Sequence, residues 1–135
     1  MVAAAALAAS SLAVAQSADA TYLGLGGQAG IKTIVANLVP MLQADPRIAA
    51  SFKDIDMAKV AMRLEEQFCE LSGGPCRYKG KDMKDIHDGL NITNAQFNAL
   101  AEDLQLAMDK ADVPTKVQNR LLAKLAPMQK TVVTK

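Results

Sequence analysis

The chain has a single histidine, His87, which lies in a segment whose residue types could carry out chemistry. The segment runs from Phe68 to Leu90 and reads FCELSGGPCRYKGKDMKDIHDGL. A neutral imidazole is a good ligand for transition metals such as iron. Alone, a histidine in a helix is usually structural or exposed. Here, helical patterns that need a shared core flank the segment on both sides, so His87 is the main candidate for a ligand to a metal or cofactor.

Two cysteines lie in the same segment, Cys69 and Cys76, with a Gly-Gly-Pro turn between them. In an oxidising compartment this turn could bring their Cα atoms within the roughly 7 Å that a disulfide needs. Cys69 also falls on a helical pattern beside Phe68, where a buried free thiol is common. The sequence leaves both states open and slightly favours the free thiol. Two cysteines and one histidine do not by themselves make a zinc site.

Length and composition predict one domain with an aliphatic core. The chain has 135 residues, 50% of them hydrophobic, but no tryptophan and only five tyrosines and phenylalanines together. Its seven methionines are either ordinary core residues or soft packing against a large planar ligand. The formal charge is +1, with acidic and basic residues interspersed. We therefore expect a monomer that neither binds nucleic acid nor inserts its folded domain into a membrane.

The first twenty residues, MVAAAALAASSLAVAQSADA, have a different composition from the rest. They carry no charged side chain before Asp19 and offer small-residue cleavage sites at 13–15 and 18–20, which is typical of a secretory signal. However, no lysine or arginine follows Met1, so an alanine-rich tail is the alternative. We divide the chain into residues 1–20, a signal peptide or tail, and residues 21–135, the functional domain. A signal would place the protein in the periplasm or outside the cell, and its absence would place it in the cytoplasm.

Hydrophobic periodicity predicts an all-α domain with about four substantial helices. We expect them at residues 31–43, interrupted by Pro40, at 57–71, from the Thr93 cap to about residue 108, and from Pro114 to about 128. Asp54 or Asp56 would cap the second. Residues 21–30 are interpreted as a lead-in with a glycine hinge, and 73–81 as a turn. Short helical turns are expected at 46–52 and at 82–87, where Gly89 would end the helix in a left-handed conformation.

A series of short motifs resembles the group 1 truncated haemoglobins. They are LGGQAGI, ADPRI, Phe52, DMAKV, LSGGPCRYKGKDM, IHDGL, NITNAQF and VP, in that order between residues 22 and 133. The stretch from GGPCRY to His87 is the most specific of them. The resemblance implies a two-over-two helical sandwich of the truncated globin type that holds one haem b (iron protoporphyrin IX).

The resemblance also implies roles for individual residues. His87 matches the proximal iron ligand, and Phe52 matches the aromatic residue that wedges the porphyrin. Val60 and Leu64 match positions where the distal helix faces the iron, and Val39 occupies the position that often holds a distal tyrosine. The remaining residues expected around the haem are Tyr78, Met83, Ile86, Phe97, Leu100, Leu104, Leu121 and Leu125.

Val39 and Leu64 depart from the family pattern, in which a tyrosine and a polar residue hold bound oxygen. A donor aimed at bound oxygen contributes roughly 1–3 kcal/mol, so its loss could cost about ten- to a hundredfold in oxygen retention. We therefore predict an apolar distal pocket with weak oxygen stabilisation. Gln67, one turn beyond Leu64, could instead direct its amide into this pocket, line an access channel or face water.

Basic residues near this segment are candidates for contacts with the haem propionates. Arg63 could swing over the haem edge to reach a propionate or point to water. Arg77 and Lys79, beside Tyr78, are further candidates because propionates are anionic and lie near the surface.

Three classes of function are compatible with these residues. The leading one is reversible binding of a diatomic gas (oxygen, nitric oxide or carbon monoxide) for storage, transport, scavenging or sensing. The second is an enzyme that performs nitric oxide dioxygenation, which needs an electron-donating reductase as partner, or peroxidase-like chemistry, which usually needs a distal base. The third is a haem-free helical interaction module, which the colour of the purified protein would distinguish from the others.

Overall fold

The structure, a computed structural model, describes residues 20–135. Residues 20–24 form a helical turn, and all later regular elements in this part of the chain are helical, as the periodicity predicts. The α-helices are α2 (Gly27–Ala44), α3 (Met57–Leu71), α4 (Met83–His87), α5 (Asn94–Lys110), α6 (Thr115–Leu125) and α7 (Gln129–Val132). Two 3-10 helices, η1 (Ala49–Phe52) and η2 (Ala126–Met128), complete the set. The predicted signal peptide or tail falls almost entirely outside the described residues.

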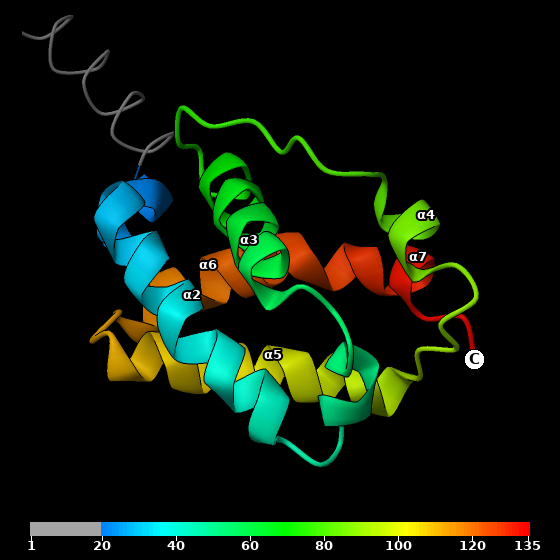
Figure 1. Cartoon of the computed structure of the whole chain (residues 1–135). Coiled ribbons are helices and arrows are strands. Elements are labelled where there is room, and N and C mark those ends of the chain that lie inside the picture. Colours follow the sequence, from blue (N-terminus) through cyan, green and yellow to red (C-terminus); the bar gives the residue numbers. More distant parts are fainter. Residues whose placement is uncertain (1–19) are drawn as a thin grey trace, which may run out of the picture.

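The four long helices form two pairs, α2 with α3 and α5 with α6, and one pair crosses the other (Figure 1). Helix α2 packs against both α3 and α5, and α6 packs against α5 and α3. The short helices α4 and α7 pack together at the end of the molecule where the C-terminus lies (Figure 1). This is the predicted two-over-two helical sandwich. No helix within residues 20–135 is both long enough and apolar enough to cross a membrane.

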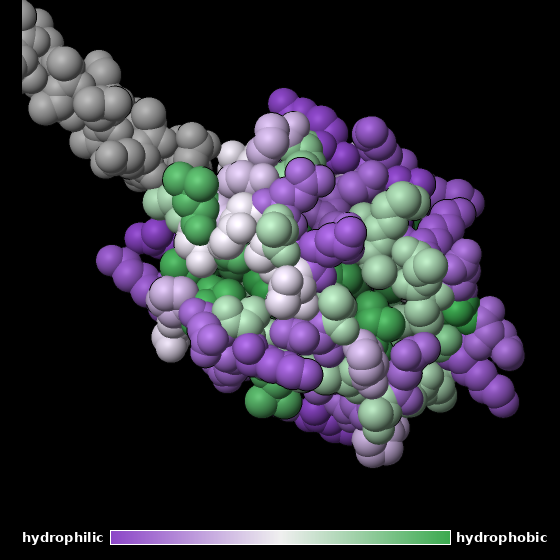
Figure 2. All heavy atoms as spheres, turned by 60° about the vertical axis from the view of Figure 1, so that its left-hand side comes forward, coloured by the Kyte–Doolittle hydropathy of each residue, from purple (hydrophilic) through white to green (hydrophobic). Residues whose placement is uncertain are grey.

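The core between the pairs is aliphatic, as the composition predicts. Its largest fully buried side chains are Ile31, Ile34, Val35, Leu38, Leu42, Phe68, Cys69, Leu104, Met108 and Leu121. Figure 2 shows a face of the molecule on which hydrophilic residues surround the hydrophobic ones that reach the surface. Burial of the apolar stripe of each helix is the main source of helix stability here, because most isolated helices of these lengths are marginal in water.

Helix α2 begins at Gly27, four residues before the predicted start at residue 31. The glycines that suggested a hinge instead form the tight entry into the helix. Gly26 precedes the helix with a φ of 94°, in the left-handed region that favours glycine. Gly30 lies so close to the carbonyl of Leu25 that a Cβ at this position would overlap its oxygen. The glycines therefore permit a close turn between residues 20–24 and α2.

The helix then continues without interruption through Pro40, where we expected a kink or a local rearrangement. It ends at Ala44, one residue after the predicted end, because Asp45 precedes Pro46 and adopts an extended conformation with a ψ of 111°. The short helical turn expected in this region is present as η1, and its last residue is Phe52.

Side-chain caps fix the next helices at the predicted positions. Asp56 caps α3, since its carboxylate accepts hydrogen bonds from the backbone amides of Ala58 and Lys59. Thr93 caps α5 within a reciprocal pair with Gln96, in which each side chain bonds the backbone amide of the other residue. The last predicted helix is divided into α6, η2 and α7, because Pro127 within η2 cannot donate a backbone hydrogen bond.

A cluster of charged residues that the sequence did not reveal fixes the corner between α2 and η1. Arg47 Nη2 lies 2.8 Å from Asp45 Oδ2, and its Nη1 pairs with Glu102 on α5. The same Nη2 lies 3.7 Å from Asp103 Oδ1. The hydrogen bonds from Arg47 hold the pKa of Asp45 well below its usual value. Burial, together with the neighbouring Asp45, raises the pKa of Asp103 to about 6. The guanidinium of Arg47 therefore links three carboxyl groups at the corner that leads to Phe52.

Candidate functional site

His87 is the last residue of α4, a helix of five residues. Asp82 caps this helix by accepting a hydrogen bond from the backbone amide of Lys84 at 2.8 Å. At the other end, Gly89 has a φ of 79°, in the left-handed conformation that we predicted there. A helix this short does not persist by itself, so its packing against α7 is needed to hold His87 in place.

The imidazole of His87 is oriented by its own helix. Its Nδ1 lies 2.7 Å from the carbonyl oxygen of Met83, four residues earlier. Since a carbonyl can only accept, Nδ1 carries the proton, and in the neutral imidazole Nε2 keeps its lone pair. A histidine that ligates a metal usually shows this arrangement, with its second ring nitrogen donating to a carbonyl or carboxylate. This partner was not predicted from the sequence, although the four-residue helical spacing between Met83 and His87 is a signal for it.

The apolar residues predicted to surround the haem come from several elements. Five of them are partly buried and pack against the core while keeping some accessible surface: Val39 from α2, Phe52 from η1, Leu64 from α3, Leu100 from α5 and Leu125 from α6. Val60, Tyr78, Met83 and Phe97 are also partly buried. Ile86 is exposed to 39%, and Leu104 and Leu121 are fully buried within the core.

These residues fit a haem group. Five elements present accessible aliphatic or aromatic side chains, which suit the faces of a flat apolar macrocycle. His87 supplies a nitrogen lone pair of the kind that binds haem iron. Cys69 and Cys76, the two cysteines of the chain, are bonded to each other, so neither offers a thiolate ligand.

The predicted distal residues Val39, Val60 and Leu64 carry no polar side-chain group. Gln67 is 9% exposed and directs its amide toward two methionine sulfurs. Its Nε2 lies 3.3 Å from the sulfur of Met128 and 3.7 Å from the sulfur of Met83. Of the alternatives for Gln67, contact with water is therefore excluded by burial, and the amide lies between α3, α4 and η2.

Arg63, whose side chain is 30% exposed, pairs with a glutamate of its own helix. Its Nη1 lies 2.8 Å from Glu66 Oε1, which also accepts a hydrogen bond from the backbone amide of Lys79. The bond from Arg63 lowers the pKa of Glu66. Arg77, exposed to solvent, approaches Glu70 at 4.0 Å. Two glutamates of α3 thus hold the connection that leads to α4.

Tyr78 is fixed within the same connection. Its hydroxyl donates a hydrogen bond of 2.7 Å to the carbonyl of Lys81, and its backbone amide donates to Glu70 at 2.6 Å. Burial raises the pKa of Tyr78. The ring lies against Gly80, where a Cβ would collide with it. The connection between α3 and α4 is therefore without regular secondary structure but ordered by specific contacts.

The preference for a free thiol at Cys69 was wrong. Cys69 and Cys76 form a disulfide with a Cα–Cα distance of 5.7 Å. Cys69 is buried on α3, as predicted, but the chain reverses directly after the helix. The amide of Gly74 donates to the carbonyl of Cys69 at 2.8 Å, and this turn returns Cys76 to the helix. The helical pattern had suggested burial correctly, but burial of one cysteine does not exclude a bond to a partner from the following turn.

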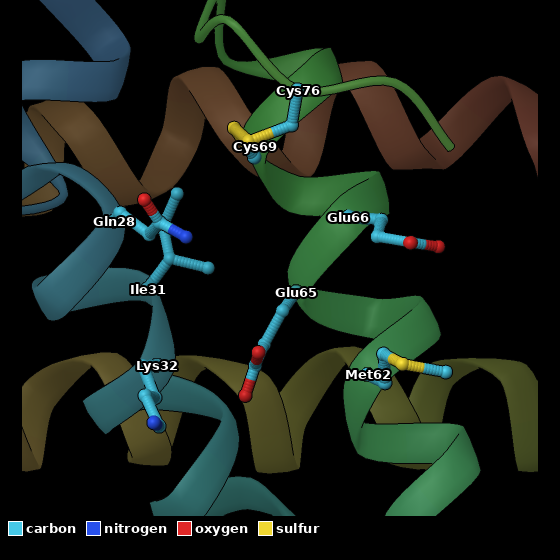
Figure 3. A pocket seen from close by; sticks show the side chains of 8 residues that line it. All are labelled: Gln28, Ile31, Lys32, Met62, Glu65, Glu66, Cys69 and Cys76. Carbon is cyan, nitrogen blue, oxygen red and sulfur yellow. A yellow bond between two sulfur atoms is a disulfide. The ribbon is translucent and has the colours of Figure 1, made fainter. Parts of the chain in front are cut away.

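A cavity of about 250 Å³ lies between α2 and α3, beside the disulfide (Figure 3). It is lined by Gln28, Ile31, Lys32, Met62, Glu65, Glu66, Cys69 and Cys76. It contains neither His87 nor any predicted haem contact, so it is separate from the candidate site.

Comparison with known proteins agrees with this geometry. The sequence profile of the family described as bacterial-like globin matches residues 20–134. A group 1 truncated haemoglobin of Tetrahymena thermophila is 34% identical over 69% of this chain and 77% of its own length. One from Mycolicibacterium paratuberculosis is 29% identical over 84% of this chain and 83% of its own.

Solved structures agree as well. The truncated haemoglobin of Tetrahymena pyriformis in its Fe(III) form superposes with a TM-score of 0.82 at 30% identity, covering 85% of this chain and 98% of that one. The 2/2 haemoglobin of Synechococcus sp. PCC 7002, in a cyanomet state with covalently attached haem, gives 0.76 at 25% identity, covering 85% and 98%. This chain therefore belongs to the bacterial-like globin family and, within it, to the group 1 truncated haemoglobins.

Proposed function

We propose that this protein binds haem b through His87 and uses the iron to bind a diatomic gas reversibly. The observation that carries the proposal is the hydrogen bond of 2.7 Å between His87 Nδ1 and the carbonyl of Met83. It leaves Nε2 as the free lone pair of the one histidine in the chain. Family membership implies haem binding, and this bond favours Nε2 as the nitrogen that would hold the iron.

The attachment is proposed to be non-covalent. Haem of the c type is attached through cysteine thioethers, and the two cysteines of this chain are engaged with each other. The haem would be held by the bond to His87 and by burial between Phe52, Leu64 and Leu100. Haem b, which needs no cysteine, is therefore the form that these residues suit.

When bound, haem would supply an iron with a position open to a small ligand. The residues proposed to face that position, Val39, Val60 and Leu64, exclude water but donate no hydrogen bond. Bound oxygen carries partial negative charge and depends on such a donor more than carbon monoxide does. We therefore propose that the protein retains oxygen weakly and prefers carbon monoxide over oxygen comparatively strongly. The same residues provide no distal base for peroxidase chemistry.

The disulfide supports the proposal that the protein acts in an oxidising compartment. Structural disulfides persist in the periplasm or outside the cell and are rare in the cytoplasm. The composition of residues 1–20 agrees with export. Mass spectrometry of the protein from its native host would test this, since an exported protein would lack these residues and contain the disulfide.

The function itself is tested by His87→Gly. The wild-type protein should purify with, or take up, haem and show a Soret band, and the ferrous form should bind carbon monoxide. His87→Gly should lose the iron–histidine stretching band in resonance Raman spectra, and added imidazole should restore a five-coordinate ferrous haem. A folded wild-type protein that takes up no hemin would refute the proposal, as would a variant with an unchanged iron–histidine band.

A further inference from the structure

We propose that Gln67 is a positioning residue for His87, acting through Met83. This inference rests on the proposed function, because it concerns the imidazole that would hold the iron. Met83 is the link between the two residues: its sulfur lies 3.7 Å from Gln67 Nε2, and its carbonyl oxygen lies 2.7 Å from His87 Nδ1.

The need for such a link follows from the size of α4. The helix has five residues, fewer than an independent helix requires. Two of its contacts are at its ends, where Asp82 caps it and Leu90 donates a backbone bond to the carbonyl of His87. It packs against α7 on one side. The contact between Gln67 and Met83 connects its first turn to α3 as well.

The burial of Gln67 indicates that its amide has a specific role. A buried amide costs free energy unless its donors are satisfied, and thioether sulfur is a weak acceptor. A leucine or methionine would fill the same position between Met83 and Met128 without that cost. The amide nevertheless lies within 3.7 Å of both sulfurs. It therefore fixes the Met83 side chain directionally, which an apolar contact would not do.

The arrangement joins the two sides of the proposed haem site. Gln67 lies three residues after Leu64, so one helix, α3, supplies both the distal wall and the tether of the proximal segment. A shift of Met83 would move the carbonyl oxygen that accepts the hydrogen bond from His87 Nδ1. The strength of that hydrogen bond sets the basicity of the imidazole and its rotation, which are reported by the iron–histidine stretching frequency.

The test compares Gln67→Leu, Met83→Leu and the double variant, each loaded with haem. In the unliganded ferrous form, both single variants should shift or broaden the iron–histidine band, and haem loss to apomyoglobin should be about two- to tenfold faster. The double variant should differ little from either single variant, because both remove the same contact. Met128→Leu is the matched control, because it removes the other sulfur near Gln67, at 3.3 Å. It leaves the contacts from Gln67 through Met83 to His87 in place, so its iron–histidine band should match that of the wild type.

An unchanged band in both single variants, additive shifts in the double variant, or an equal shift in Met128→Leu would overturn the inference. If Gln67→Leu fails to fold, as judged by circular dichroism, Met83→Leu alone decides, because it retains the amide and removes only its acceptor. The proposed function fails separately, through an unchanged iron–histidine band in His87→Gly. If that band is lost in His87→Gly but unaffected by Gln67→Leu and Met83→Leu, only the present inference is wrong.

Discussion

One carboxylate oxygen of Asp103 lies 3.7 Å from Arg47 Nη2, whereas its other oxygen is buried without a hydrogen-bond partner. The residue is only 4% exposed. Burial of the charged form, next to the ionised Asp45, raises the pKa of Asp103 to about 6. At neutral pH the corner between α2 and η1 therefore contains a carboxylate with incomplete solvation.

The first prediction concerns the pH dependence of stability. Because the pKa of Asp103 is higher in the folded than in the unfolded state, the folded protein binds more protons, and the free energy of unfolding should fall as the pH rises through about 6. Asp103→Asn should abolish this part of the fall and stabilise the protein at pH 7.5, by about 1–3 kcal/mol if its amide satisfies the site. Urea unfolding of both proteins at pH 5 and pH 7.5 checks it. Equal changes between the two pH values in both proteins would contradict it.

Asp45 should act in the opposite direction. Its hydrogen bonds from Arg47 lower its pKa, so its contribution to stability is present above its unfolded pKa and is lost as the pH falls below about 4. Asp45→Asn should therefore weaken the acid-induced loss of stability relative to wild type. Acid titrations followed by circular dichroism would measure this, and curves of equal steepness for both proteins would exclude it.

The disulfide should stabilise the fold by restricting the unfolded chain. For a loop of this length, the chain-entropy contribution is about 2.5 kcal/mol. Cys76→Ser should lower the free energy of unfolding by about this amount, since Cys76 is only partly buried and its replacement leaves the core intact. Reducing agent should lower the stability of the wild type to a similar level and leave Cys76→Ser unchanged. A wild-type protein insensitive to complete reduction would argue against a stabilising bond.

Val39→Tyr should convert the proposed distal pocket into one that retains oxygen. A hydroxyl donor to bound oxygen is worth roughly 1–3 kcal/mol, so oxygen dissociation should slow by about ten- to a hundredfold. Stopped-flow replacement of oxygen by carbon monoxide measures this rate. The dissociation of carbon monoxide serves as the control and should change much less. Slow oxygen dissociation already in the wild type would show that another donor acts in the pocket.

Gly30→Ala tests the entry into α2. Helix propensity alone favours alanine over glycine by about 1 kcal/mol inside a helix. The new Cβ would, however, overlap the carbonyl oxygen of Leu25, a backbone atom that cannot rotate away. We therefore expect destabilisation, measured by thermal unfolding. Ala36→Gly, at an exposed position of the same helix, is the comparison that reports propensity alone. A stabilised Gly30→Ala protein would mean that the turn relaxes without cost.

The fold was predictable because its signals are local. The apolar stripes of α2, α3 and α5, the caps at Asp56 and Thr93, and the left-handed Gly89 each depend on residues within one or two turns. The early start of α2 was not predicted, because the reason for Gly26 and Gly30 is a close approach to Leu25 that only the folded turn creates.

The site was predicted in outline for the same reason. His87 and its short helix follow from local motifs, and the wall residues follow from the family resemblance. The contacts that fix the surrounding structure are mostly between residues distant in sequence, such as Gln67 with Met128 and Arg47 with Asp103, separated by 61 and 56 positions. Periodicity carries no information about such pairs. The disulfide joins residues that are close in sequence, but the spacing of the two cysteines was compatible with free thiols as well as with a bond.

The last residues of the chain are hydrogen-bonded to the loop that follows His87. The backbone amides of Thr134 and Lys135 both donate to the carbonyl of Ile92, at 2.9 and 3.1 Å. Figure 1 shows the C-terminus beside α4 and α7. An affinity tag fused after Lys135 would consequently emerge next to the proposed iron ligand, and a polyhistidine tag would bring foreign imidazoles within reach of it. Recombinant protein for spectroscopy should therefore carry its tag at the other end, or have it removed.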